Sequence, residues 1–260
     1  SIMNVEEVLL RIESFAPLEK AESWDNVGLM AGDTQWSVTK IGVALDPSLS
    51  AVEEGVQKGC DLLVVHHPLI FSPLQKIDLK EPLCQAILWA LENHLAIISL
   101  HTNWDKAPEG VNVQLGRVLF KDGFLPLVPE EKTWGLGAVG ELIHPLCLRD
   151  LMASLRSLWN LSWVVGYGDE NKPLCHGALC GGSGGDLWKE AMDKGAQVFI
   201  TADMKYHQIL DACSAGLSLC IVDHGEMERF SLASLAALLR TPEIVVFELE
   251  DKGPLRIVSE

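Results

Sequence analysis

Histidines and carboxylates recur in three short segments of this chain. The segments read HHP, HTNWD and HGEME, and they begin at His66, His101 and His224. Neutral imidazole and carboxylate together form the donor set that Zn, Mn, Fe, Co and Ni bind. One such segment is weak evidence, because a histidine at a strand end usually hydrogen-bonds its own loop, but three segments predict a metal site suited to two bridged ions. The candidate ligands are four histidines, one aspartate and one of two glutamates: His66, His67, His101, His224, Asp105 and either Glu226 or Glu228.

A glycine-rich segment, CGGSGGD, begins at Cys180 and allows two kinds of chemistry. Its backbone N–H groups suit an anion at a helix N-terminus, so Gly182 and Ser183 are candidate contacts to a substrate phosphate. The same letters match the nucleophile elbow G-x-S-x-G, in which Ser183 would attack with the help of an aspartate and a histidine. The candidates for those two roles are Asp203 or Asp211 and His207 or His224. A serine mechanism leaves the HHP and HTNWD segments without a use, so we favour the metal site.

Two further polar segments could serve the same site. In TADMKYH, the threonine or the aspartate can cap a following helix, whereas Lys205 and His207 can bind an anionic substrate or move protons. We count Lys205 among the candidate substrate contacts, and His207 and His101 as candidate acid–base catalysts. In WDNVGL, which begins at Trp24, the Asp and Asn side chains are typical of a local turn, although either could reach the site.

Short apolar runs alternate with helical periodicity, which is typical of βαβ units around a largely parallel or mixed sheet. The runs predict strands at 40–45, 61–66, 95–100, 174–180, 197–201, 218–222 and 243–249. The periodicity predicts helices at 4–14, 48–58, 82–93, 110–119, 148–158, 186–194, 204–214 and 229–239. The polar segments follow strands, and ligands in open α/β sheets gather beyond the carboxyl ends of strands.

The two halves of the chain resemble each other. KGCDLLVV at 58–65 matches KGAQVFIT at 194–201, and the His-x-x-x-carboxylate pattern at His101–Asp105 recurs at His224–Glu228. We therefore predict an α/β fold of two pseudo-symmetric βαβ halves with mixed sheets, and a metal site between them at the strand ends. The predicted halves are 1–120 and 121–260, and 121–173 supplies connecting strands and a helix.

Composition excludes several classes of function. The 260 residues carry a formal net charge of −16 and are 48% hydrophobic, which is ordinary for a globular protein. Such an acidic surface repels phosphate backbones and anionic lipid, so nucleic-acid or membrane binding is disfavoured as the main function. The acidic N-terminal segment is unlike a secretory signal, and the seven cysteines contain no C-x-x-C pair, which favours a reducing cytoplasm.

Taken in order, WDNVGL, DLLVVHHPLIF, HTNWD, CGGSGG, TADMKYH and DHGEME resemble a dinuclear-metal family known as the GTP cyclohydrolase I type 2 homologues, also described as NGG-one-interacting-factor-three-like. The similarity covers nearly the whole chain and its length resembles that of the short branch. It implies a hexameric ring around an enclosed cavity, with His101 as a ligand or a neighbour of the ligands. The metal ligands that it implies are His66, His67, Asp105, His224 and Glu228. The chain departs from the family pattern at Asp223, where many relatives have histidine, and at Ala202-Asp203, where many have Gly-Glu.

These observations favour a metal-dependent hydrolase that acts on a nucleotide-like or heterocyclic substrate, with two divalent transition-metal ions per chain. Two metals would polarise the substrate and supply hydroxide near neutral pH. The same ligands would serve a protein that holds or delivers a metal or a metal cofactor without turnover. A third hypothesis is a regulatory scaffold whose metals are structural, in which case removal of the metal should unfold the protein.

Overall fold

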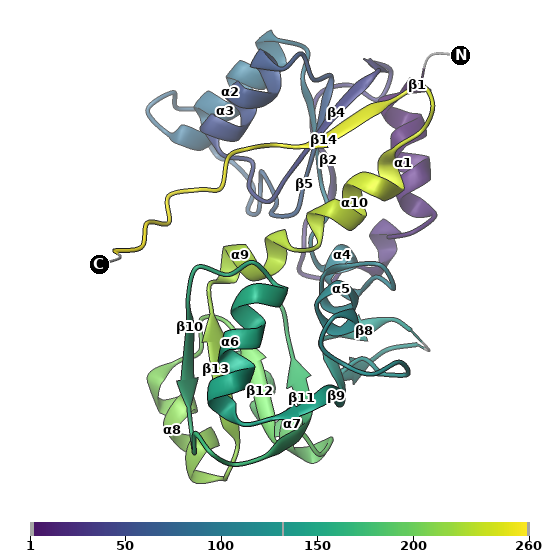
Figure 1. Cartoon of the computed structure of the whole chain (residues 1–260). Helices are drawn as coiled ribbons and strands as arrows, with labels where there is room; N and C mark the ends of the chain where they lie inside the picture. Colours follow the sequence, from purple (N-terminus) through teal and green to yellow (C-terminus); the bar gives the residue numbers. More distant parts are fainter. Residues whose placement is uncertain (1–2, 132, 259–260) are drawn as a thin grey trace. The chain divides into compact units, whose positions relative to one another are not determined.

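The computed structural model describes residues 3–131 and 133–258, which divide into two compact units (Figure 1). Unit 1 comprises Ser1–Trp104 and Leu232–Glu260, and unit 2 comprises Asp105–Ser231. These bounds differ from the expected halves 1–120 and 121–260, because the last strand of the chain returns to the first sheet. That strand, β14 (Val245–Glu248), pairs in parallel with β4 (Lys40–Ala44).

Unit 1 is built on a five-stranded mixed sheet. The strand order is β14-β4-β5-β6-β2, with β5 at Leu62–Val65, β6 at Ala96–Ser99 and β2 at Gly28–Ala31. Neighbouring strands are parallel except that β2 runs antiparallel to β6. Every residue of β5 and β6 is buried, as expected for parallel strands that are covered on both faces. The helices are α1 (Val5–Glu13), α2 (Leu49–Gln57), α3 (Pro82–Glu92) and α10 (Leu232–Leu239), and two short strands pair as β1 (Met3–Asn4) and β3 (Ser37–Val38).

Unit 2 repeats the central arrangement. Its sheet has the order β10-β13-β12-β11-β9, in which the three central strands are parallel and the two outer strands are antiparallel. The strands are β9 (Ala138–Leu146), β10 (Val164–Tyr167), β11 (Leu174–Leu179), β12 (Val198–Thr201) and β13 (Ser218–Val222). The helices are α5 (Val111–Arg117), α6 (Leu148–Leu158), α7 (Trp188–Asp193), α8 (Tyr206–Ser214) and α9 (His224–Arg229), with a hairpin of β7 (Val128–Pro129) and β8 (Gly135–Leu136). The predicted mixed α/β architecture is confirmed.

The sequence missed one helix that matters for the site. The predicted helix over 229–239 corresponds to α10, but a further helix, α9, precedes it. Helix α9 begins at His224 because the side chain of Asp223 accepts a hydrogen bond of 3.0 Å from the backbone N–H of Glu226. The HGEME segment is therefore helical, and residues four apart in it share one face. Likewise, a separate short helix, α4 (Thr102–Lys106), precedes α5 and contains most of the HTNWD segment.

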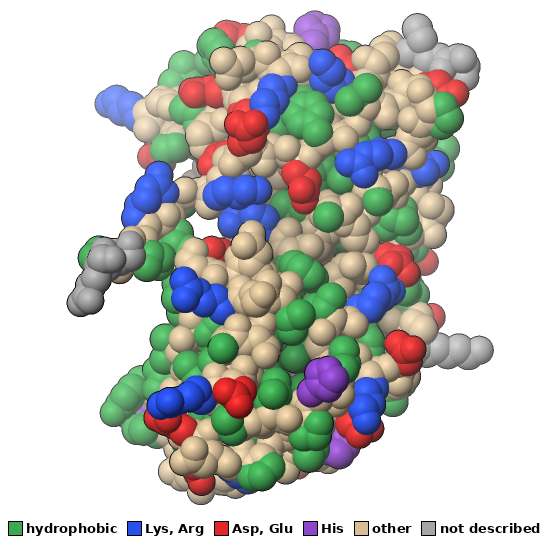
Figure 2. Space-filling view, in the orientation of Figure 1, with side chains coloured by type: hydrophobic (Ala, Val, Ile, Leu, Met, Phe, Trp, Pro, Cys, Tyr) green, Lys and Arg blue, Asp and Glu red, His purple; other side chains and the backbone are tan. Residues whose placement is uncertain are grey.

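None of the helices in the described part of the chain has the length and apolarity needed to span a bilayer. Figure 2 shows acidic and basic side chains interspersed with apolar ones over the face in view. The excess of acidic residues therefore does not form one continuous acidic patch on that face.

Candidate metal-binding site

Three imidazoles meet at the strand ends of unit 1, and we call them the imidazole cluster: His66, His67 and His101. His66 and His67 follow β5, and His101 follows β6. The ring centroids lie 5.0 Å apart for His66 and His67, 5.4 Å for His66 and His101, and 5.8 Å for His67 and His101. One ligand atom from each residue lies within 4.8 Å of the others, a grouping that could hold a metal ion.

Adjacent residues of a strand point to opposite faces, so His66 and His67 could share a site only if the chain left the strand there. It does so, because β5 ends at Val65. The backbone N–H of His67 then donates to the carbonyl of Leu45 at 2.9 Å, and the N–H of His66 contacts the same carbonyl at 3.2 Å. Both imidazoles consequently turn toward His101.

Each imidazole of this cluster is held through Nδ1. The partner is the backbone carbonyl of Leu100 for His66 at 2.8 Å, Oδ1 of Asp46 for His67 at 2.6 Å, and Oδ1 of Asp25 for His101 at 2.9 Å. A carbonyl or carboxylate oxygen can only accept, so Nδ1 carries the proton and the lone pair of the ring lies on Nε2. This is the usual arrangement around histidines that bind metal.

Asp25 is more than a turn residue. Its side chain is fully buried, and its second oxygen accepts from the backbone N–H of Thr102 at 3.0 Å and from Thr102 Oγ1 at 2.6 Å. Burial alone would raise the pKa of Asp25, but the hydrogen bonds from His101 and Thr102 outweigh it and lower the pKa to about 2. The sequence assigned Asp25 mainly to a local turn and missed Asp46 altogether; the one signal for Asp46 is its position just beyond β4.

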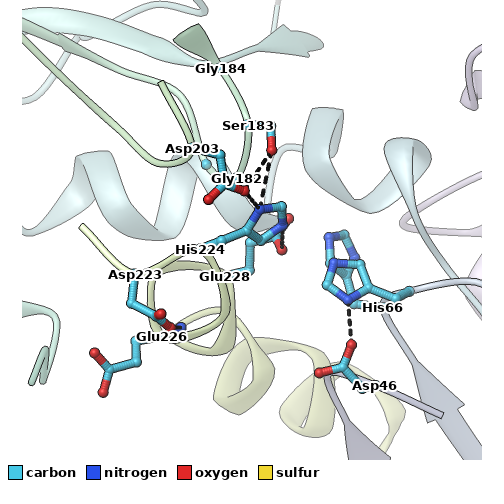
Figure 3. Close-up of polar contacts among 12 residues, drawn as sticks. Asp46, His66, Gly182, Ser183, Gly184, Asp203, Asp223, His224, Glu226 and Glu228 are labelled. Atoms are coloured by element: carbon cyan, nitrogen blue, oxygen red, sulfur yellow. Dashed lines mark hydrogen bonds and ion pairs between the residues drawn. The ribbon is translucent and has the colours of Figure 1, made fainter. Parts of the chain in front are cut away.

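Unit 2 presents a second group of ligand types, the mixed cluster of Asp203, His224 and Glu228 (Figure 3). Nε2 of His224 lies 2.6 Å from Oε1 of Glu228, four residues later on α9. Nδ1 of His224 lies 2.6 Å from Oδ2 of Asp203, which follows β12. The other candidate, Glu226, instead accepts hydrogen bonds from the backbone and side chain of Ser162. Within α9, Glu228 is therefore the carboxylate that accompanies the histidine.

The mixed cluster is strongly coupled. The hydrogen bond to Glu228, with further help from Asp203, outweighs the effect of burial and raises the pKa of His224 to about 9. Burial would raise the pKa of Asp203, but its hydrogen bonds from His224 and Ser183 lower it overall. Asp203 adopts φ +52°, an uncommon left-handed conformation for a residue other than glycine. Two carboxylates beside one imidazole make this group attractive to a divalent cation.

The glycine-rich segment passes close to the mixed cluster. A Cβ added at Gly182, which has φ +74°, would lie 3.0 Å from Oε2 of Glu228 and 3.2 Å from Nε2 of His224. Ser183 Oγ donates to Oδ2 of Asp203 at 2.8 Å and lies 3.3 Å from Nδ1 of His224. In a serine triad the base would use one ring nitrogen for the serine and the other for the aspartate. Here Ser183 and Asp203 both face Nδ1, so the geometry does not favour the nucleophile elbow.

Asp105, on α4, is tied to the glycine-rich segment through Asn112. The side-chain amide of Asn112 donates to the backbone carbonyl of Asp105 at 3.0 Å, and its Oδ1 accepts from the N–H of Gly181 at 2.8 Å. Asn112 is 1% exposed, and no motif in the sequence selects it as a site residue. Burial, with the charges of Asp105 and Glu228, raises the pKa of Cys180 to about 12, which disfavours this thiol as a ligand.

Lys205 and His207 lie at the start of α8 and are exposed. The backbone N–H of Lys205 donates to the side chain of Gln208 at 3.1 Å, and the ring of His207 packs edge-on against Tyr206 at 5.6 Å. Their predicted roles in substrate binding and proton transfer remain predictions, as does the predicted role of His101 as an acid–base catalyst.

Comparison with known proteins identifies relatives over nearly the whole chain. A "GTP cyclohydrolase 1 type 2 homolog" of Clostridium acetobutylicum is 31% identical over 226 residues, which cover 86% of this chain and 84% of that protein. "NIF3-like protein 1" of Drosophila melanogaster is 30% identical over 262 residues, covering 97% of this chain and 88% of that protein. The crystal structure of a Staphylococcus aureus hypothetical protein superposes with a TM-score of 0.93 at 26% identity and covers 99% of this chain and all of that chain.

A Bacillus cereus protein related to NIF3 shares the fold as well, with a TM-score of 0.94 at 21% identity over 99% of this chain. Residues 3–253 match the family described as Duf34/NIF3 (NGG1p interacting factor 3). The resemblance seen in the sequence motifs is thereby confirmed, and the chain is a member of the Duf34/NIF3 family.

Proposed function

We propose that this protein is a metal-dependent hydrolase that binds two divalent transition-metal ions per chain and acts on a nucleotide-like or heterocyclic substrate. The ligands that we propose are His66 and His67 from unit 1 and three residues from unit 2: Asp105, His224 and Glu228. The substrate class is suggested by relatives named as GTP cyclohydrolase 1 type 2 homologues.

The observation that carries the metal proposal is shared by four histidines. In His66, His67, His101 and His224, Nδ1 lies 2.6–2.9 Å from a carbonyl or carboxylate oxygen. In His66, His67 and His101 this contact holds the tautomer whose lone pair lies on Nε2, whereas Nε2 of His224 faces Oε1 of Glu228 and must lose a proton before it can bind a metal ion. Hydrogen bonding to loop backbone alone would not require the same nitrogen to be engaged in every ring.

Bound metal would supply Lewis acidity and a source of hydroxide near neutral pH. The residues of the chain would do the rest. Backbone N–H groups of the glycine-rich segment, at Gly182 and Ser183, would bind substrate phosphate, with Lys205 as a cationic contact. His101 or His207 would move a proton to or from the reacting group. The pairing of His101 with Asp25 suits this role, because the carboxylate fixes the orientation of the ring.

The decisive experiment measures metal content and turnover in the same preparations. Protein purified without added metal should contain about two ions per chain by elemental analysis, and His66→Ala and His224→Ala should each lose metal while circular dichroism stays near that of the wild type. His176→Ala is the matched control, because this histidine is exposed on β11. Full metal stoichiometry in alanine variants of all five proposed ligands would refute the assignment.

The turnover screen starts with GTP and other nucleotides. Chelation should abolish any activity, and Mn, Fe, Co or Zn should restore it to different extents. Ser183→Ala should cost far less than His224→Ala, because a lost loop hydroxyl matters less than a lost ligand. A dead serine variant together with chelator-resistant wild type would replace the metal mechanism by the nucleophile elbow. Metal binding without any turnover would favour metal or cofactor delivery.

The resemblance also implies a homohexamer, which light scattering at micromolar concentration would test.

A further inference from the structure

Two large aromatic side chains lie exposed beside the imidazole cluster of unit 1. Trp24 is 60% exposed and Phe71 is 54% exposed. Their ring centroids are 6.1 Å apart with the planes tilted by 59°. The ring of Trp24 also meets His101 edge to face, with the ring centroids 6.2 Å apart. Trp24 therefore contacts both Phe71 and an imidazole of the cluster.

The loop that carries Trp24 is held on both sides. Before it, the backbone N–H of Glu22 donates to Thr102 Oγ1 at 2.8 Å. After it, Asp25 accepts hydrogen bonds from His101 and Thr102, and Asn26 Nδ2 donates at 2.6 Å to the carbonyl of Ile70, the residue before Phe71. The segments that carry the two aromatic rings are therefore tied to each other and to the segment that carries His101. Water-exposed aromatic rings that are fixed in this way are preorganised to bind a flat apolar partner.

We propose that Trp24 and Phe71 form a stacking platform for the planar nitrogen heterocycle of the substrate, such as a nucleobase. A heterocycle on the ring of Trp24 lies next to His101, and the His101 ring lies beside those of His66 and His67. Every heterocycle offers a π-face, so stacking selects a flat ring without fixing which base it is. This inference rests on the proposed metal-dependent function, because it uses the nearness of the platform to the proposed ligands to identify the bound ring as substrate.

The test compares a probe that contains a base with one that lacks it. GTP, UTP and inorganic triphosphate are titrated into the metal-loaded full-length protein by calorimetry. Trp24→Ala and Phe71→Ala should each weaken GTP and UTP binding by between about fivefold and a hundredfold, the range measured for loss of one stacked base. Triphosphate affinity should stay unchanged. Trp24→Phe should retain most of the nucleotide affinity, because it keeps an aromatic ring.

Trp89→Ala is the matched control, since Trp89 is a 43% exposed tryptophan on α3 of the same unit. Metal content is measured for every variant. Equal loss of triphosphate and nucleotide binding, unchanged nucleotide binding in both alanine variants, or a wild type that binds neither nucleotide would overturn the platform. Failure of the metal proposal is distinguishable, because a protein without metal could still show base-dependent binding that Trp24→Ala removes.

Discussion

The two ligand groups of this protein occupy corresponding places in two similar sheets, yet their chemistry differs. Both lie at the carboxyl ends of three successive parallel strands, β4-β5-β6 in unit 1 and β11-β12-β13 in unit 2. In each unit, an aspartate beyond one strand holds Nδ1 of the histidine that follows the next strand: Asp46 holds His67, and Asp203 holds His224. In both units, therefore, an aspartate at the end of one strand orients the candidate metal-binding histidine at the end of the next.

The difference lies at Nε2. In the imidazole cluster each ring has two other imidazoles beside it, whereas in the mixed cluster Glu228 lies 2.6 Å from Nε2 of His224. Without metal, this carboxylate favours the protonated form of His224, so that a proton must leave when a metal ion binds there. We infer that a duplicated strand scaffold can keep the supporting residues constant while it changes the charge and the pH response of the ligands.

The largest effect should come from removing the aspartates that hold the two histidines. Asp46→Ala and Asp203→Ala should each weaken metal affinity by about 10–100-fold, because the ring loses its orientation and its fixed tautomer. Competition with a coloured chelator measures the change. Asp46→Asn and Asp203→Asn should lose less, since Oδ1 can still accept from Nδ1. Asp169→Ala, at an exposed position, is the control. If either Asp46→Ala or Asp203→Ala left the metal affinity unchanged, the aspartate–histidine contact would not have the same role in the two units.

Alanine substitutions at two glycines distinguish steric crowding of the mixed cluster from backbone strain. Gly182 and Gly195 have φ +74° and +86°, so alanine at either should cost about 1 kcal/mol of stability. At Gly182 the new Cβ would press on Glu228 and His224, whereas at Gly195 it meets nothing within 4 Å. Gly182→Ala should additionally lower metal affinity by about tenfold. Thermal unfolding and metal titration of both variants measure the two effects, and equal metal affinities would contradict the proposed crowding.

The smallest effect is the difference in pH response of the metal-free protein. The pKa of His224 is raised to about 9, so its contribution to stability is complete below pH 6.5 and is lost as the pH rises through 9. The loss should be about 1–2 kcal/mol, reduced from the full shift by solvent screening of a partly exposed ring. Urea unfolding between pH 6.5 and 9.5 measures it, and His224→Ala should flatten the profile.

For Asp25 in unit 1 the sign is reversed. Its pKa is lowered to about 2, so its contribution is complete above pH 4 and is lost as the pH falls toward 2. Unfolding at pH 6.5–9.5 should therefore not respond to Asp25→Asn as it responds to His224→Ala. If Asp25→Asn removed the pH dependence of the unfolding free energy between pH 6.5 and 9.5, that dependence could not be assigned to the mixed cluster.

The sequence alone determined the elements and the types of ligand. Continuous apolar runs such as LLVV and AIIS predicted buried parallel strands, because only strands covered on both faces lack polar alternation. The histidines and carboxylates that follow these runs predicted metal ligands, and the motif order predicted the family. The helix that begins at His224 was readable in principle, since Asp223 stands three residues before Glu226 as an N-cap, but the apolar periodicity predicts a helix only from residue 229.

Tertiary structure alone decided which atoms support the ligands. Asp46 stands 21 residues from His67, and Asn112 stands 69 residues from Gly181, so no local spacing connects them. Asn112 reaches Gly181 from helix α5. Asp46 meets His67 because the neighbouring parallel strands β4 and β5 bring their carboxyl ends together across a long crossover, and strand pairing depends on non-local packing. The same reason returns the last strand, β14, to the first sheet. Residue types along a chain can show which chemistry is available, but the tautomer of each histidine follows from the oxygen that the fold places at its Nδ1.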